Sequence, residues 1–272
     1  MSILTQEQTK KISDRVMSLT KADECIVNIE GSTIGNIRFA RNAVSTAGLA
    51  DDTRIQVQVA FGKKQGTATI NEFDDKSIER AVRRAEDLAK LAPDNPEFIP
   101  AIAKTAYKPS DTFVQKTADI DPEYRAQAAA YAIEGCRKRG LVSAGFFTDR
   151  TSFETVANSN GLFGHQVATS LDFTLTVRTE DGRGSGWVKR SARDVSKFDP
   201  REAAEIAIEK ALRSVDAKAL EPGRYTVIME PAATSDLLSF MLGGFDARRA
   251  DEGRSFLSKA GGKNRLGDKL FD

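Results

Sequence analysis

The chemistry to consider first is metal-assisted or nucleophilic catalysis, and the histidine count limits both. The chain has one histidine, His165, among its 272 residues, so an HExxH motif or any zinc site with two imidazoles cannot be built from this chain alone. His165 could join a serine and an aspartate in a triad, but the sequence contains no GxSxG nucleophile elbow. We therefore assign no catalytic residue and no metal-binding residue in this chain.

The two cysteines offer a second kind of chemistry, and their positions argue against it. Cys25 and Cys136 lie far apart and form neither a CxxC pair nor a disulfide series, which is typical of a reducing compartment. Cys25 falls in an alternating apolar stretch, and Cys136 precedes three basic residues near the expected end of a helix. We predict structural thiols and a cytoplasmic protein.

A dense run of mixed charge lies near the end of the sequence. Residues 246–254 alternate acids and bases and include Arg248, Arg249 and Arg254. Arginines in such a run can bind a peptide carboxylate or a partner surface through bidentate hydrogen bonds. A solvated loop of salt bridges is the alternative, and the sequence leaves both open. The three arginines are our candidates for substrate or partner contact.

The overall charge excludes some classes of partner. The chain has 40 Lys and Arg against 39 Asp and Glu, and residues 246–272 contain seven basic and five acidic side chains. Phosphate binding needs a much more concentrated positive face. No window approaches the roughly 20 apolar residues that span a bilayer, and residues 1–11 lack the apolar core of a signal peptide. We expect neither direct nucleic-acid binding nor a membrane partner.

The elements that must position these residues begin with a helix and several strands. Thr5 and Gln8 have the spacing of a capping box at the start of a helix. Alternating apolar residues then predict two short strands at residues 25–29 and 35–39, separated by a break at Gly31.

Clearer patterns follow along the chain. Residues 55–61 and 171–177 alternate apolar and polar side chains, which predicts half-buried strands. Residues 75–91 and 199–215 have helical periodicity, and the glycine-rich residues 182–186 predict a hairpin turn rather than a phosphate loop, because no helix follows them directly.

The order helix, strands, helix occurs twice, which suggests an internal duplication. A second helix capped by Asp121 and followed by a strand from Leu141 completes the second copy. The predicted fold class is α+β, with antiparallel sheets layered with helices. The expected divisions are a first repeat unit at residues 1–100, a linker at 101–117, a second repeat unit at 118–220 and the start of a further domain at 221–272.

That further domain opens with a different pattern. Residues 225–229 alternate as a strand, Pro231 interrupts them, and residues 232–242 have the composition of a helix.

Several segments resemble, in order and spacing, the PmbA and TldD proteins, a metallopeptidase family once called modulators of DNA gyrase. The segments are RFARN at residues 38–42, VANSNG at 156–161, PGRYTVIMEP at 222–231 and RSFL at 254–257. The resemblance extends over essentially the whole chain. It implies that residues 221–272 lead into a mostly β C-terminal domain, of which the greater part is absent from this sequence.

The resemblance also implies a branch of the family. TldD-like members carry an HExxxH motif on the helix that follows the first strand of this further domain. There the motif binds a metal and activates water. The corresponding helix here reads TSDLLSFML at residues 234–242 and has neither His nor Glu. This difference is typical of the PmbA-like branch, also called TldE, whose members lack the metal ligands. Zinc is then expected only in a TldD-like partner, and no cofactor is expected in this chain.

The resemblance therefore predicts a non-catalytic subunit of a heterodimeric zinc metallopeptidase that acts on unfolded proteins or peptides. The alternative is a binding protein that modulates a topoisomerase or a toxin–antitoxin partner without proteolysis. An independent enzyme with an unrecognised site ranks last, since no pair of nucleophile and base is visible.

Overall fold

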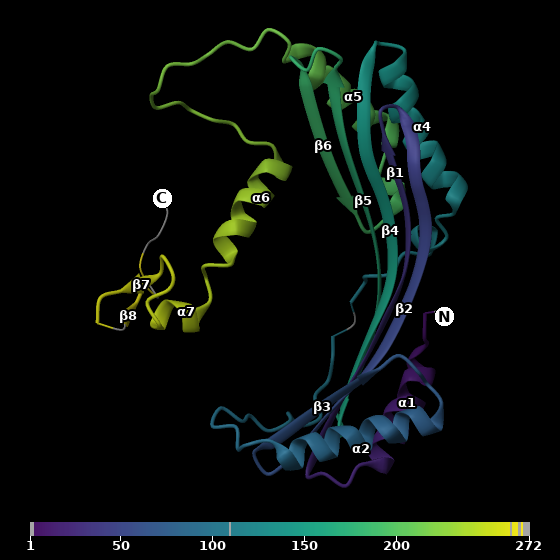
Figure 1. The fold of residues 1–272 in the computed structure, drawn as a ribbon, viewed down its shortest axis with the longest axis vertical. Helices are drawn as coiled ribbons and strands as arrows, with labels where there is room; N and C mark the ends of the chain where they lie inside the picture. The colour runs from purple at the N-terminus through teal and green to yellow at the C-terminus, as the bar shows by residue number, and fades with distance from the viewer. Residues whose placement is uncertain (1–2, 109, 262, 266–267, 269–272) are drawn as a thin grey trace. The chain divides into compact units, whose positions relative to one another are not determined.

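The computed structural model describes residues 3–108, 110–261, 263–265 and 268 (Figure 1). The chain divides into two compact units, Met1–Asp216 and Ala217–Asp272. The first unit contains a mixed set of helices and long strands, and the second is smaller and mostly helical or irregular. Among the described residues, no helix combines the length and the apolar character needed to cross a membrane.

The first unit repeats one order of elements. The elements are α1 (Gln6–Leu19), β1 (Glu24–Ala40), β2 (Ala43–Phe61), β3 (Lys64–Ile70), α2 (Asp75–Leu91), α3 (Gln115–Ala118), α4 (Pro122–Arg137), β4 (Leu141–Asn158), β5 (Phe163–Thr179), β6 (Ser185–Ala192), η1 (Val195–Lys197) and α5 (Pro200–Arg213). The predicted α+β class with antiparallel strands and helices is confirmed. The same helix, three strands and helix occur before and after the linker, and their origin by duplication stays a prediction.

All six strands form one antiparallel sheet. Its order is β3-β2-β1-β4-β5-β6, so the first strands of the two copies, β1 and β4, pair with each other in the middle. The short strands β3 and β6 lie at the two sides and each cover only part of a longer neighbour. The two predicted repeat units therefore share one sheet.

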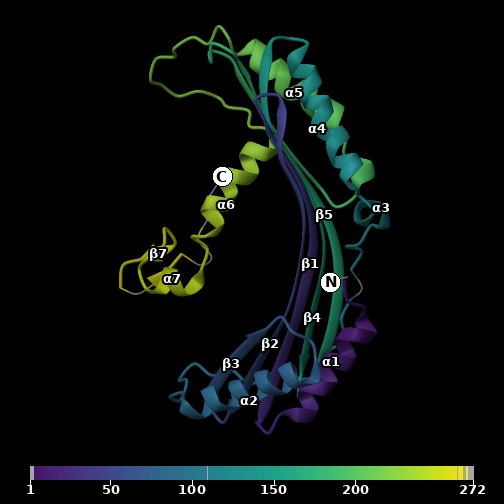
Figure 2. The ribbon, with the colours of Figure 1, turned by 45° about the vertical axis from the view of Figure 1, so that its right-hand side comes forward.

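The helices cover a single face of this sheet. Alternate residues along β1 are buried, such as Val27, Ile29 and Phe39. The partners of Val27 and Ile29 on β2 and β4 are buried too. Helices α1, α2, α4 and α5 lie on this side, which is the convex side of the curved sheet in Figure 2. The intervening residues form the opposite, uncovered face, because side chains alternate along a strand.

Two separate hydrophobic cores form beneath the helices. The first core lies under α1 and α2 and contains Ile29, Ile55 and Phe153. The second core lies under α4 and α5 and contains Phe39 and Phe173, among others. Strands β1 and β4 contribute buried residues to both cores, which explains their lengths of 17 and 18 residues.

The helix starts follow the predicted capping chemistry. The Thr5 hydroxyl accepts the Gln8 N–H at 3.2 Å while the Gln8 side chain accepts the Thr5 N–H, which is the expected capping box. Asp121 and Asp199 cap α4 and α5, each followed by proline in the first turn. These bonds satisfy amide groups that a helix start otherwise leaves unpaired.

The predicted break at Gly31 is wrong. The chain passes through it as one continuous strand, β1, rather than as two short strands separated by a break. A Cβ at Gly31 would lie 2.6 Å from the ring of Phe153 on β4. The glycine therefore makes room for a neighbouring aromatic side chain and does not form a turn.

The second unit contains α6 (Pro231–Leu242), α7 (Ala247–Asp251) and a two-residue pair of strands, β7 (Ser258–Lys259) and β8 (Lys263–Asn264). The predicted helix after Pro231 is confirmed, and the predicted strand at residues 225–229 is wrong. Val227 is 72% exposed and Ile228 96% exposed. A strand needs a hydrogen-bonded neighbour, and none of the described residues supplies one here.

Candidate functional site

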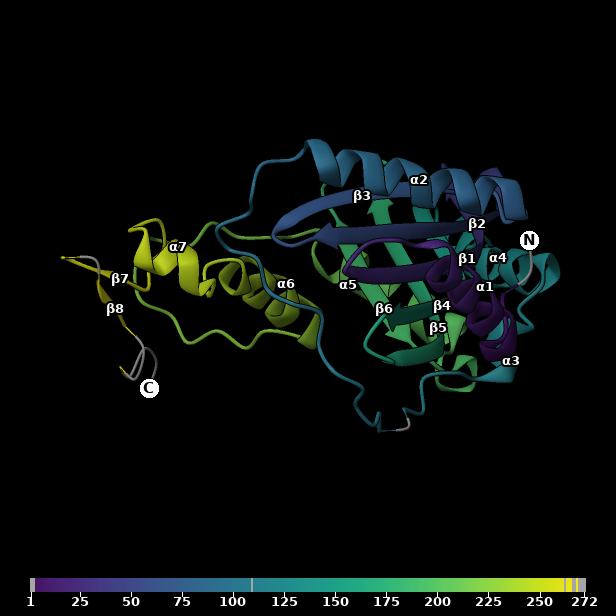
Figure 3. The ribbon, with the colours of Figure 1, turned by 90° about the horizontal axis from the view of Figure 1, so that it is seen from below.

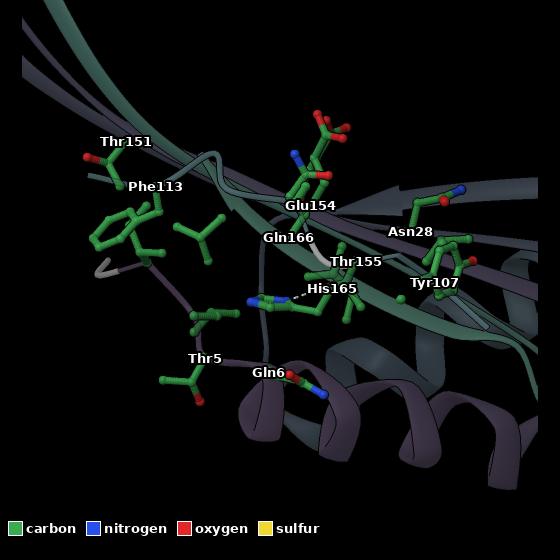
Figure 4. Close-up of a pocket in the computed structure, with 18 of the residues that line it drawn as sticks. Thr5, Gln6, Asn28, Tyr107, Phe113, Thr151, Glu154, Thr155, His165 and Gln166 are labelled. Carbon is green, nitrogen blue, oxygen red and sulfur yellow. Dashed lines mark hydrogen bonds between the residues drawn. The ribbon is translucent and has the colours of Figure 1, made fainter. Parts of the chain in front are cut away.

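A cavity of about 1500 Å³ lies in the first unit, where the linker passes the edge of β5. It is bordered by the start of α1, by residues of β1, β2, β4 and β5, and by linker residues that include Tyr107 and Phe113 (Figure 4). The only histidine, His165, is part of its lining.

The linker is held against β5 and the end of β4 by hydrogen bonds that involve its main chain and its side chains. The Thr169 N–H donates to the Thr112 carbonyl at 2.9 Å, and the Thr112 hydroxyl donates to the Val167 carbonyl at 2.7 Å. Further back, the Asn158 amide donates to the Ile102 carbonyl at 2.8 Å. Figure 3 shows the linker as the loop that leaves α2 and reaches α3. A part of the β5 edge that β6 does not reach is thereby covered.

His165 is fixed by hydroxyl groups and by an aromatic ring. Its Nδ1 lies 2.8 Å from the Thr155 hydroxyl and 3.3 Å from the Thr9 hydroxyl of α1, and its ring stacks on Phe153 with centroids 6.0 Å apart. Burial lowers the pKa of His165 below its ordinary 6.5. The imidazole is therefore neutral at neutral pH.

This arrangement gives His165 no reactive partner. The nearest hydroxyls belong to Thr155, which is 4% exposed, and to Thr9, which is fully buried. A nucleophile must reach its substrate, and neither hydroxyl can do so. No carboxylate is among the hydrogen-bond partners found for the ring. The geometry supports a structural role for the histidine between α1 and the sheet.

A row of polar side chains crosses the uncovered face beside the cavity. Arg54, Glu30, Glu154 and Gln166 occupy directly opposed positions on β2, β1, β4 and β5, and Arg54 Nε donates to Glu30 at 2.5 Å. The sequence analysis did not single out these residues. The sequence shows these residues only as polar positions that alternate with buried ones. The pairing of β1 with β4 is needed to bring the four side chains together.

The candidate arginines lie in the second unit. Arg248, Arg249 and Arg254 are all exposed, in or just after the short helix α7. Arg248 Nε pairs with Glu252 at 2.9 Å, Arg254 pairs with the same carboxylate, and Arg249 Nη1 donates to the Gly243 carbonyl at 3.2 Å. The structure thus brings two of the three together around one acid, while their role in contact with a partner stays a prediction.

The sequence was compared with models of known protein families, and the matches cover nearly the whole chain. PmbA/TldA metallopeptidase domain 1 matches residues 26–89, the central domain matches 71–215, and the C-terminal domain matches 222–272. The chain belongs to the PmbA/TldD metallopeptidase family. A separate search of curated proteins gives no match.

Solved structures with the PmbA/TldD fold agree with this assignment. A putative modulator of DNA gyrase from Thermotoga maritima matches 92% of the chain with a TM-score of 0.82 and 18% identity. One from Bacteroides thetaiotaomicron matches 94% with a TM-score of 0.78 and 20% identity. TldE from Thermococcus kodakarensis matches 75% with a TM-score of 0.68 and 16% identity. The chain covers 58%, 61% and 47% of these three chains, respectively.

A metallopeptidase family raises the question of whether these residues fit a zinc ion, and they do not. Within the described part of the chain, no three His, Cys, Asp or Glu side chains are grouped to hold a metal. Helix α6 carries no His and no Glu. Burial raises the pKa of Cys25 to about 12 and that of Cys136 to about 11, so both buried thiols remain protonated and are poor ligands.

Proposed function

We propose that this chain is a TldE-like, non-catalytic subunit of a heterodimeric zinc metallopeptidase that cleaves unfolded proteins or peptides. The observation that carries the proposal is the composition of α6. This helix follows the segment PGRYTVIMEP, which resembles the family, at the place where the TldD-like branch carries HExxxH, and here the helix reads PAATSDLLSFML. It offers neither an imidazole for zinc nor a glutamate to activate water.

The remaining residues also support a non-catalytic role for this chain. The single histidine is held by Thr155 and Thr9 and stacked on Phe153, so it is not available to a distant metal. Catalysis then depends on a TldD-like partner that brings its own zinc. The contribution of this chain is binding, and Arg248, Arg249 and Arg254 are the residues proposed to contact the partner or the substrate.

The first experiment is co-expression with a TldD-like subunit from the same genome, with the affinity tag on the partner. The proposal predicts that the chain co-elutes with the partner and that the pair cleaves an unfolded peptide in a chelator-sensitive manner, while each chain alone is inactive. Separate elution of the two chains would contradict the proposal. Because the chain spans about half the length of its solved relatives, assembly by these residues is itself part of what is tested.

The arginines are tested by charge reversal. A triple variant with Arg248→Glu, Arg249→Glu and Arg254→Glu is expected to weaken co-elution or to raise the KM for peptide. The matched control reverses Arg183 and Arg213, whose side chains are 65% and 82% exposed on the first unit. If the triple variant associates and cleaves like the control, the three arginines have no role in contact.

A second candidate function is suggested by the names of two solved relatives, which describe putative modulators of DNA gyrase. On this proposal the chain binds a topoisomerase, or a toxin–antitoxin pair, without proteolysis. Binding to purified gyrase at physiological salt, in the absence of any TldD-like partner, would favour it. Inactivity of the co-eluting pair on peptides would favour it further.

A further inference from the structure

A small polar hollow lies on the face of the sheet that the helices of the first unit leave uncovered. Its volume is about 130 Å³, and it is lined by residues of β1, β2 and β4. Ser32 of β1, the middle strand of the three, stands directly opposite Asp52 on β2 and Ser152 on β4. Figure 4 shows another lining residue, Glu154, on the opposite side of the strands from His165. We call this feature the serine hollow.

The serine hollow exists because two short side chains lie between rows of long ones. Two residues along the strands in one direction, Glu30 and Glu154 oppose each other. Two residues along in the other direction, Arg150 opposes Ile34. Such rows on one face of a sheet are about 7 Å apart. The two serines therefore form a floor of hydroxyl groups between longer side chains.

The Ser32 hydroxyl is buried and lacks a partner. Ser32 is 8% exposed, and its hydroxyl makes no hydrogen bond to any of the described residues. In the described part of the chain, every side-chain polar atom that is completely enclosed has a partner. The Ser32 oxygen is therefore open to the hollow that it lines. Buried polar groups are nearly always hydrogen-bonded, so this hydroxyl is placed to accept a hydrogen bond from a bound molecule.

The charges around the serine hollow favour a positively charged group. Arg54 Nε donates to Glu30 at 2.5 Å, so these two charges largely cancel. Asp52, Glu154 and Arg150 also line the hollow, and none of the three forms an ion pair with a described residue. Two acids against one base leave the hollow negative. A cation is therefore attracted to it.

The size of the hollow and the spacing of its acids select the kind of cation. Asp52 and Glu154 lie on β2 and β4 with β1 between them, so their strands are about 10 Å apart. Among the described residues, no three acids, histidines or cysteines are grouped to hold a metal ion. A volume of about 130 Å³ equals that of about four water molecules. A guanidinium is a small planar group whose five N–H donors reach acceptors on several sides, whereas an ammonium is compact.

We propose that the serine hollow binds the guanidinium group of an arginine side chain in an extended peptide. Asp52 and Glu154 accept its N–H donors from two sides, and the hydroxyls of Ser32 and Ser152 accept from the floor. Arg150 is exposed at the rim, where it donates to carbonyl oxygens of the peptide main chain. The proposal rests on the proposed function in one respect, that the substrates are peptides, and it makes arginine a side chain that this subunit selects.

The test is calorimetric titration of the purified chain alone with short peptides. The probe has one arginine among glycines and is blocked at both ends, so that the guanidinium is its only charge. The matched probe carries citrulline, which has nearly the same shape and no charge. The arginine peptide should bind at least about tenfold more tightly than the citrulline peptide, because charge-assisted hydrogen bonds are lost. A lysine peptide should fall between them. Equal binding of the arginine and citrulline peptides, or no binding of either, would overturn the proposal.

Ser32→Val tests the floor of the hollow. It removes the hydroxyl and fills the space with methyl groups, so the preference for arginine over citrulline should disappear. The matched control is Ala144→Val, which adds similar bulk on the same face of β4, where Ala144 opposes Ala40 and Thr176 outside the hollow. This control should bind like the unchanged chain. An undiminished preference in a folded Ser32→Val chain would contradict the proposal.

Glu154→Gln tests the wall and keeps the proposal falsifiable if Ser32→Val disturbs the fold. It removes one charge with little change in shape, and it should weaken binding of the arginine peptide by about tenfold. Glu134→Gln, which removes an exposed acid of α4, is the control and should have no effect. Equal affinities of these two variants would overturn the proposal.

The outcome is distinguishable from a failure of the proposed function, because no TldD-like partner is present in the titrations. A pair that co-elutes and cleaves peptides, but whose TldE-like chain does not distinguish arginine from citrulline, would overturn the arginine site alone. Selective binding of the arginine peptide by a chain that does not associate with the partner would support the arginine site and contradict the subunit role.

Discussion

Two buried carboxylates, one beside each core, have pKa values that are shifted in opposite directions although both are buried beside an arginine. Glu86 of α2 is 2% exposed and pairs with Arg83 at 2.7 Å, and Asp149 of β4 is 8% exposed and pairs with Arg125 at 2.9 Å. For Glu86, burial is the largest effect and raises the pKa, but its hydrogen bonds from the Lys21 N–H and Arg83 outweigh it and the pKa is lowered. For Asp149, burial outweighs Arg125 and the pKa is raised.

The difference lies in the number of donors. Glu86 accepts the Lys21 N–H at 2.6 Å, the Thr20 hydroxyl at 3.4 Å and the Arg83 guanidinium. Arg125 supplies the side-chain hydrogen bond to Asp149, and the other donor is the backbone N–H of Asp149 itself. A buried carboxylate held by several donors stabilises the fold at neutral pH, whereas one held by a single partner depends on that partner completely.

The largest expected effect comes from removing the single partner. Arg125 is 5% exposed and lies between the two cores, so close to Gly35 that a Cβ there would be 2.0 Å from its Nη1. Arg125→Met leaves Asp149 buried and unpaired, which should lower the free energy of unfolding by about 3–5 kcal/mol.

Arg83→Met is the control in the other half. It should cost about 1 kcal/mol, because Arg83 is partly exposed and Glu86 keeps its other donors. Equal losses of unfolding free energy in the two variants, measured by urea unfolding, would contradict this difference between the two carboxylates.

A smaller loss of stability is expected at two glycines that occupy corresponding positions in the two halves of the sheet. Gly66 of β3 and Gly186 of β6 lie under α2 and α5, where an added Cβ would be 2.1 Å from the Ala85 carbonyl oxygen and 2.0 Å from that of Ala207. Alanine at either position must push a helix away, at a cost of about 1–3 kcal/mol. The two variants should lose similar amounts in thermal unfolding. Gly48→Ala, in the exposed first part of β2 with no neighbour closer than 3.6 Å, should lose much less.

The smallest effect concerns pH. The stabilisation from Glu86 is present above its ordinary pKa of 4.5 and is lost as the pH falls through its lowered value. Glu86→Gln should therefore flatten the loss of stability in acid. Asp149 has the opposite sign, because the folded protein binds its proton more tightly than the unfolded chain, so its contribution falls as the pH rises above 3.8. The unfolding free energy is measured between about pH 3 and pH 6. Relative to the unchanged chain, its slope against pH should change in one direction in Glu86→Gln and in the opposite direction in Asp149→Asn. Changes of the same sign would contradict the assignment.

Much of the fold was predictable because local patterns determine it. The alternation at residues 55–61 and 171–177 and the caps at Thr5, Asp121 and Asp199 were read correctly from neighbouring residues. The errors came where distant residues decide. Gly31 looks like a turn until Phe153 of β4 is placed against it, and residues 225–229 alternate like a strand but have no described neighbour to pair with.

The sequence limits the chemistry of the candidate site but does not place its residues. A single histidine and the composition of residues 234–242 follow directly from the sequence. The residues around the cavity did not, because Tyr107, His165 and Glu30 come from the linker, β5 and β1 and meet only in the folded sheet. The pair of Arg125 and Asp149 was missed for the same reason, since nothing in either local sequence indicates the other.

The central claim is that this chain brings no zinc site to a PmbA/TldD assembly. The most direct measurement is the zinc content of the purified chain after incubation with zinc and dialysis, determined by mass spectrometry, together with its hydrolysis of an unfolded peptide. The account predicts no stoichiometric zinc and no hydrolysis by the chain alone, at any zinc concentration that leaves it soluble. One zinc per chain, with hydrolysis that a chelator abolishes, would contradict it.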